Sequence, residues 1–323
     1  MPELTDNPFP RTEVAHRTYA TGRADEQPVF DGQNQESPVT KIFMGPGGLR
    51  AGWRFLIFVG LYFVVGIALA WLLLPRQVVP LWSSTARLEA VLFLSAIVAS
   101  GVMGHFEKLS FADFGLPARG AFGAKFWEGT AWGFGGISIL LLALHAMGSF
   151  DYGPTALTGR AIAKYALLWG GVFLLVGFAE EYTFRGYPQF TLSTGIGFWP
   201  STLLLSALFG IVHLGNSGES AMGALLAGFI GVFFCLTLRK TGALWFAIGA
   251  HTGWDWGETF FYGVPDSGQV AHGHLFNSTF HGSKWITGGT VGPEGSVLAL
   301  VVVALMIVLY HFRFGRVNLS PRR

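Results

Sequence analysis

Residues 161–185 read AIAKYALLWGGVFLLVGFAEEYTFR. About 20 apolar residues in helical form cross a bilayer core, so this stretch predicts a transmembrane helix over Ala161–Glu181. The helix ends on two adjacent carboxylates, Glu180 and Glu181, and Arg185 follows shortly after. An ionisable side chain at membrane depth costs roughly 2.5–3.5 kcal/mol. Charges retained at such a position therefore indicate a functional site.

The whole chain has the composition of an integral membrane protein. Of its 323 residues, 51% are hydrophobic and 12% are charged, whereas a soluble domain carries about 25% charged residues. Apolar runs of spanning length predict an all-α bundle of about eight transmembrane helices. Many of its glycines lie within these runs, which suits close packing of membrane helices. The predicted spans are Trp53–Leu74, Leu88–Met103, Phe126–Met147, Ala161–Glu181, Trp199–Leu214, Ala221–Leu238, Leu244–Gly257 and Ser296–Phe312.

The chain divides into a polar tail and a membrane domain. Residues 1–50 are rich in Pro, Thr, Asp, Glu, Asn and Gln, which predicts a largely disordered cytoplasmic tail. Residues 51–320 are expected to form the membrane domain. Within it, the connection 258–295 is long and rich in Gly and His, yet it contains aromatic residues such as Phe280 and Trp285. We expect this connection to fold as a cap over the outer ends of the helices.

Lysine and arginine residues predict the orientation of the bundle. If the N-terminus is cytoplasmic, most Lys and Arg of the connecting segments fall on the cytoplasmic side. This holds whether the Lys and Arg of the N-terminal tail are counted or left out. The positive-inside rule then predicts a multi-pass protein of the plasma (inner) membrane, with both termini cytoplasmic and 258–295 outside. The net charge of +2 is too small to indicate a nucleic-acid partner.

The first cluster of charges is Glu180-Glu181-Tyr-Thr-Phe-Arg185. Adjacent helical residues point about 100° apart, so the two carboxylates cannot share one face. Arg185 follows Glu181 at the spacing at which helical side chains meet, which predicts an ion pair between them. Glu180 is then free to face a cavity, where its apolar surroundings suit a general base. The alternative is a charge cluster at a helix end without a chemical role.

Two further pairs lie on other predicted spans, at the same helical spacing. Phe209 lies one turn before His213 and could stack on its ring, although His213 alone also fits a polar helix end at the interface. His251 and Asp255 suit a His–carboxylate pair or two ligands of one metal; alternatively, they form a hydrogen-bonded pair that joins helices. Glu258 lies on the same face, but we expect it at the outer edge and leave it out of the site.

The motifs Glu-Glu-x-x-x-Arg, Phe-x-x-x-His and His-x-x-x-Asp, each on its own membrane helix and in that order, resemble those of the type II CAAX prenyl endopeptidases. The resemblance extends to their bacterial relatives, the CAAX protease and bacteriocin-processing (CPBP) family, and covers roughly residues 85–260. It implies an intramembrane endopeptidase acting on a peptide or protein substrate that is lipidated or otherwise associated with the bilayer.

The resemblance also implies roles for the residues of the three motifs. Glu180 and His213 would activate a water molecule, and His251 with Asp255 would stabilise the oxyanion or help to bind a metal. Eukaryotic members often have Asn at the place of Asp255, and an ionised carboxylate cannot donate a hydrogen bond to an oxyanion, so Asp255 could instead orient His251. The remaining motif residues, Glu181, Arg185 and Phe209, would support the site.

The residues leave the metal requirement open. Glu180, His213 and His251 are enough for a zinc site with an open position, and zinc would lower the pKa of its bound water to about 7. A Glu–His pair without a metal could also act as the base.

Two other functions fit intramembrane acids and imidazoles. The first is a non-enzymatic immunity or scaffold protein of the same fold. The second is an ion-coupled transporter, for which the chain offers no internal repeat.

The predicted spans place the three motifs at different depths. Glu180 would lie near the cytoplasmic side, His213 near the far end of its helix, and His251 about mid-span. We therefore expect Gly186–Phe198 to form a bend that stays partly submerged, since Gly and Pro punctuate it and covered non-helical backbone is tolerated at membrane depth.

Overall fold

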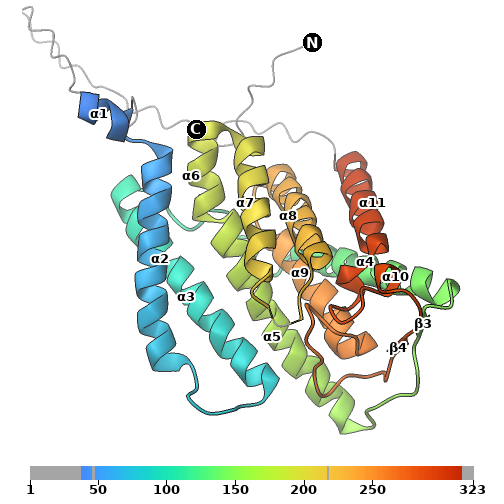
Figure 1. The fold of residues 1–323 in the computed structure, drawn as a ribbon. Coiled ribbons are helices and arrows are strands. Elements are labelled where there is room, and N and C mark those ends of the chain that lie inside the picture. Colours follow the sequence, from blue (N-terminus) through green and yellow to red (C-terminus); the bar gives the residue numbers. More distant parts are fainter. Residues whose placement is uncertain (1–37, 46–47, 217, 315–323) are drawn as a thin grey trace, which may run out of the picture.

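The structure is a computed structural model that describes residues 38–45, 48–216 and 218–314. It is an all-α bundle, as predicted, and each predicted span corresponds to a helix (Figure 1). These helices are α2 (Ala51–Leu73), α3 (Leu81–Glu107), α4 (Ala124–Ala146), α5 (Arg160–Arg185), α7 (Phe198–His213), α8 (Ala221–Thr241), α9 (Trp245–Trp256) and α11 (Val297–Arg313).

Five helical segments among the described residues are long and apolar enough to cross a membrane. They are α2, α3, α4, α8 and the combined segment Arg160–Ile196, and α7 and α11 are shorter apolar helices. These helices identify an integral membrane protein. The seventh predicted span is different, because α9 has 12 residues and nearly all of them are buried inside the bundle. A helix covered by protein on every side has the same apolar sequence as one that faces lipid.

Most of the predicted tail lies outside the described residues. The described part of 1–50 contains the short helix α1 (Pro38–Phe43), followed by strands β1 (Met44–Gly45) and β2 (Gly48–Leu49), which pair antiparallel.

One end of the bundle gathers several helix termini. Arg54, at the start of α2, forms an ion pair of 2.9 Å with Glu107 at the end of α3. The same guanidinium donates to Thr194 in α6 (Tyr187–Ile196) at 2.6 Å. Lys240, at the end of α8, donates to the backbone carbonyl of Phe314, just beyond α11. Helix α2 therefore begins, and α11 ends, on the same side of the bundle (Figure 1).

The segment predicted to be a submerged bend is a helix. Pro188 lies in the first turn of α6, and Gly197, with a φ of +86°, ends it. A Pro just inside the start and a Gly just past the end are ordinary helix boundaries. The break from α5 is a single residue, Gly186, and most of α6 is buried. The expectation of non-helical backbone here was wrong.

The helical form of this segment removes the conflict of depths. Helix α6 extends α5, and α7 returns alongside them from the turn at Gly197 (Figure 1). Glu180 and His213 lie at nearly equal sequence distances from that turn, so two antiparallel helices bring them to the same level.

Helix α9 packs closely against α4 through glycines on both helices. A Cβ on Gly133 of α4 would lie 1.8 Å from the carbonyl oxygen of Ala250, and a Cβ on Gly253 of α9 would lie 2.3 Å from that of Thr130. Gly129 and Gly249 meet the opposite backbone in the same way. Small residues spaced four apart let the two backbones touch. This contact fixes the helix that carries His251 and Asp255.

The connection 258–295 is folded over one end of the helices. It begins with a π-helical turn, η1 (Gly257–Tyr262), that continues α9. Strand β4 (Thr279–Phe280) pairs antiparallel with β3 (Phe150–Asp151), which follows α4. The short helix α10 (Lys284–Thr287) and the 3₁₀ turn η2 (Pro293–Gly295) lead into α11.

The α4–α9 contact predicts a difference between two glycines of one helix. In Gly133→Ala the new methyl group would overlap the Ala250 carbonyl, whereas Gly135 has open space where its Cβ would be. We expect Gly133→Ala to lose about 1–3 kcal/mol of unfolding free energy and Gly135→Ala to remain close to the parent protein. Thermal unfolding of both variants in detergent measures the difference. Equal melting temperatures would contradict the close packing of the two helices.

Candidate active site

A cavity of about 280 Å³ lies inside the bundle. Helices α3, α5, α7, α8 and α9 line it together with the 258–295 connection. The residues that line it include Glu180, His213, His251 and Asp255, so each of the three motifs contributes to it. The motifs that lie far apart in the sequence thus meet at one place.

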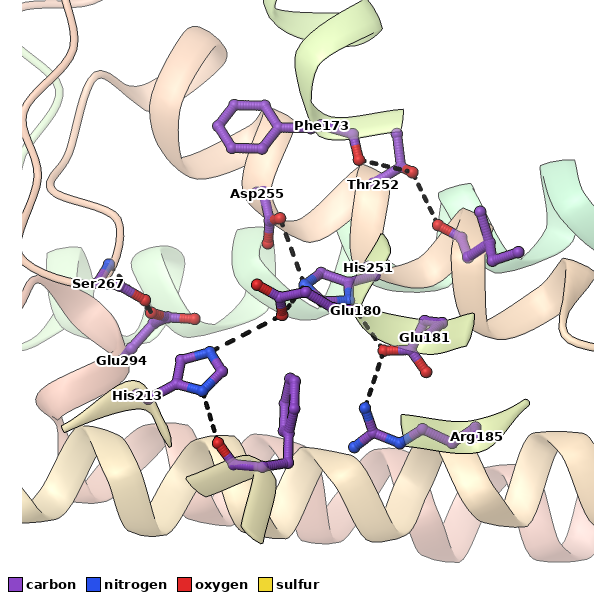
Figure 2. A network of polar contacts seen from close by, with 12 residues as sticks. Phe173, Glu180, Glu181, Arg185, His213, His251, Thr252, Asp255, Ser267 and Glu294 are labelled. Carbon is purple, nitrogen blue, oxygen red and sulfur yellow. Dashed lines mark hydrogen bonds and ion pairs between the residues drawn. The ribbon is translucent and has the colours of Figure 1, made fainter. Parts of the chain in front are cut away.

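Glu180 lies between the two imidazoles (Figure 2). Its Oε2 is 3.6 Å from Nε2 of His251 and 3.9 Å from Nε2 of His213. That oxygen is buried and has no hydrogen-bond partner among the residues that the structure describes. The two gaps exceed direct hydrogen bonds, and at such distances a bridging water becomes a natural partner.

The ring of His213 is oriented by its own helix. Its Nδ1 donates to the backbone carbonyl of Phe209 at 2.7 Å, because a carbonyl oxygen can only accept. Nε2 therefore faces Glu180. The Phe209 ring packs edge-to-face on the imidazole, with 4.5 Å between ring centroids. The predicted aromatic contact is present, with this geometry.

The ring of His251 is held from three sides. Its Nδ1 lies 2.9 Å from Oε1 of Glu181, and its Nε2 lies 3.5 Å from Oδ2 of Asp255. The ring stacks on Phe234 of α8 at 5.3 Å between centroids. One residue further, the Thr252 hydroxyl contacts the Phe173 carbonyl and ties α9 to α5 (Figure 2).

Glu181 and Arg185 form the predicted ion pair. Arg185 Nη1 lies 3.3 Å from Glu181 Oε1, and both side chains are completely buried. The guanidinium also lies over the Phe209 ring at 4.1 Å from its centroid, a distance typical of cation–π contacts. Gly231 of α8 makes room for it, since a Cβ there would lie 2.3 Å from Arg185 Nη2.

The side chains of the proposed zinc ligands do not form a ready zinc site. Among the described residues, only one group of three His, Cys, Asp or Glu has ligand atoms that all lie within 4.8 Å of one another, and it consists of Asp255, Glu258 and Asp266. Glu180, His213 and His251 do not meet this condition. Zinc needs its N and O ligands at about 2.0–2.2 Å, so the imidazoles would have to move to hold it.

The cavity is also lined by several acids that the three motifs did not predict. They are Glu89 of α3, Glu219 before α8, and Asp266 and Glu294 of the 258–295 connection. Burial raises the pKa of Glu219, and burial followed by the charge of Glu294 raises the pKa of Asp266 to about 8. Glu89 lay within an apolar run, which is the same signal that identified Glu180.

Glu258 is also placed differently from our expectation. It is fully buried, and neither carboxylate oxygen has a hydrogen-bond partner in residues 38–45, 48–216 and 218–314. The face that it shares with His251 and Asp255 was predicted, but its place at the outer edge was wrong. The connection 258–295 covers it, so the outer edge of the helix is not exposed there.

The fold and site together define a helical membrane protein with a buried carboxylate–imidazole centre. A family model described as Type II CAAX prenyl endopeptidase Rce1-like matches residues 162–257. Residues 162–257 therefore form a domain of this Rce1-like family, which is a family of CAAX endopeptidases. The matched segment contains all three motifs. It is shorter than residues 85–260, over which the sequence resembles the CAAX endopeptidases. No curated protein and no solved structure matches the chain.

The buried ion pair predicts a non-additive effect of two substitutions. Arg185→Met leaves the buried Glu181 carboxylate with the His251 ring but without its arginine, and breaking a buried pair in this way costs about 3–5 kcal/mol. Adding Glu181→Gln removes the stranded charge, so the double variant should recover much of that loss. Thermal unfolding of the two single variants and the double variant measures the coupling. Purely additive losses would show that the pair is not formed.

Proposed function

We propose that the protein is an intramembrane endopeptidase that hydrolyses a peptide bond with a water activated by Glu180 and His213. The observation that carries this proposal is the unpartnered Oε2 of Glu180, buried between two imidazoles from separate helices. The family of residues 162–257 supports the same reaction class.

The tautomer of His213 allows it to help the general base Glu180 bind the attacking water. With Nδ1–H donated to the Phe209 carbonyl, a neutral imidazole presents its Nε2 lone pair to the cavity. A water between Glu180 and His213 can donate one hydrogen to each and turn its oxygen lone pair toward the substrate carbonyl. Glu180 takes the proton as the water oxygen attacks, which is general base catalysis.

His251 is placed to stabilise the developing oxyanion. Both of its ring nitrogens face carboxylates, which only accept hydrogen bonds. In a doubly protonated ring, Nδ1–H is donated to Glu181 at 2.9 Å. The Nε2 distances to Glu180 and Asp255, 3.6 and 3.5 Å, are long for hydrogen bonds, so the Nε2–H is available to the carbonyl oxygen of a substrate. Positioned donors of this kind contribute about 2.7–4 kcal/mol in known sites. Asp255 cannot donate, so its role is to orient His251.

The leaving amine needs the proton that Glu180 has taken. When the tetrahedral intermediate collapses, the C–N bond breaks and the protonated Glu180 returns its proton to the amine nitrogen. The carboxylate is thereby regenerated, and one water is consumed for each peptide bond. Glu181 and Arg185 keep the ring of His251 in place throughout.

The substrate is proposed to be a peptide or protein that is lipidated or otherwise associated with the bilayer. The cavity lies within the bundle, and apolar side chains of α3 and α5 line one of its walls, among them Leu88, Phe173 and Val176. We place the protein in the plasma (inner) membrane with both termini in the cytoplasm, following its distribution of Lys and Arg.

Peptide cleavage by purified protein in detergent tests the assignment of the base. Glu180→Gln and His213→Ala should each lower the cleavage rate by about 10²–10⁴-fold. Glu128→Gln, the same chemical change in a surface ion pair with Lys125, serves as the matched control. Equal rates in all variants would refute the assignment. A non-enzymatic scaffold would keep its cellular phenotype with Glu180→Ala, whereas a protease would lose it.

The ligand geometry also predicts the response to a chelator. Because Glu180, His213 and His251 do not form a three-ligand site, the rate should be the same with and without 1,10-phenanthroline, which removes zinc. Restoration of a lost rate by added zinc would contradict the metal-free mechanism.

A further inference from the structure

Three carboxylates meet just beyond the proposed hydrolytic residues. Asp255 ends α9, Glu258 lies in the π-helical turn η1 that continues it, and Asp266 lies in the covering connection. Each contributes one oxygen, and the three oxygens lie within 4.8 Å of one another. Oxygens that share a Ca²⁺ ion at 2.3–2.6 Å can be at most about 5 Å apart, so the spacing suits that ion.

Glu258 is the member of this cluster that points to a ligand. Its exposed fraction is 0%, and neither of its oxygens has a hydrogen-bond partner within the described part of the chain. The charged side chains that act on it, Asp255, Asp266 and Glu294, are all acidic. A buried charge needs a partner, and no cationic side chain among the described residues is found to act on this carboxylate.

A proton shared between two of these carboxylates would join only one pair at a time. A cation would instead be shared by all three carboxylates at once. π-Helical turns such as η1 are frequent at functional sites.

We infer that Asp255, Glu258 and Asp266 form a binding site for a hard divalent cation of the calcium class. Carboxylate oxygens are the ligands that such ions prefer. The Thr259 hydroxyl donates to Asp266 Oδ2 at 3.1 Å and holds that ligand in place. The bound ion would fasten the 258–295 connection to α9, beside the pair of Asp255 and His251.

Terbium luminescence tests the site directly. Tb³⁺ substitutes for Ca²⁺, and Trp254 and Trp256, which flank Asp255, can sensitise its emission. The full chain in detergent, stripped with EDTA, should give saturable Tb³⁺ emission that Ca²⁺ displaces. We expect Glu258→Gln and Asp266→Asn to bind Tb³⁺ at least about tenfold more weakly, since affinity follows the number of charged ligands. Asp151→Asn, an exposed acid elsewhere, should bind like the parent.

Thermal unfolding gives a second readout that a misfolded variant could not mimic. In EDTA, Glu258→Gln should melt at the parent temperature or above it, because it removes an unpaired buried charge. Added Ca²⁺ should raise the melting temperature of the parent, as expected for a ligand of the folded state, and leave that of Glu258→Gln unchanged. Neither readout depends on peptide cleavage.

The inference is overturned by any of three results. The parent protein gives no saturable Tb³⁺ emission, Glu258→Gln binds as tightly as the parent, or Asp151→Asn loses as much affinity as Glu258→Gln. The last result would show diffuse attraction to surface acids in place of a defined site.

Discussion

The carboxylate of Glu181 joins the two helices on which the proposed site is built. It contacts Arg185 one turn along α5 and Nδ1 of His251 on α9, and it is fully buried. In an apolar interior such a charge is tolerated only with partners, so the arginine and the imidazole are needed to keep it there. In turn, it fixes which nitrogen of His251 faces the cavity. The position of the ring opposite Glu180 depends on this contact.

Close packing of the backbones holds the helices around that contact. Glycines at four-residue spacing on α4 and α9 bring the two backbones together, which places a short, buried helix in the centre of the bundle. On the other side of the site, α5 and α6 run in one direction and α7 runs back beside them. The lengths of these helices place Glu180 and His213 at the same height in the bundle. The site therefore follows from close backbone packing on one side and from helix length on the other.

The sequence predicted the helices and which motif side chains share a face within each helix, because apolar run length and the 3.6-residue repeat are local properties. Prediction from the sequence was wrong where the structure of a segment, or the burial of a side chain, depends on other parts of the chain that cover it. Gly186 and Pro188 predicted a bend, whereas in the structure Gly186 is a one-residue break between two helices and Pro188 lies in the first turn of the second. Glu258 was expected at the edge of the bundle, since the burial of its side chain depends on a connection that returns from far along the chain. Glu89 carried a usable signal, an acid within an apolar run, that was overlooked.

An experimental structure of the protein in lipid tests the central claim most directly, through the position of the Glu180 carboxylate. The account predicts that Oε2 lies between Nε2 of His213 and Nε2 of His251, close to the separations of 3.9 and 3.6 Å found here, with room for one water between them. A structure in which the three side chains point apart, toward lipid or bulk solvent, would contradict it.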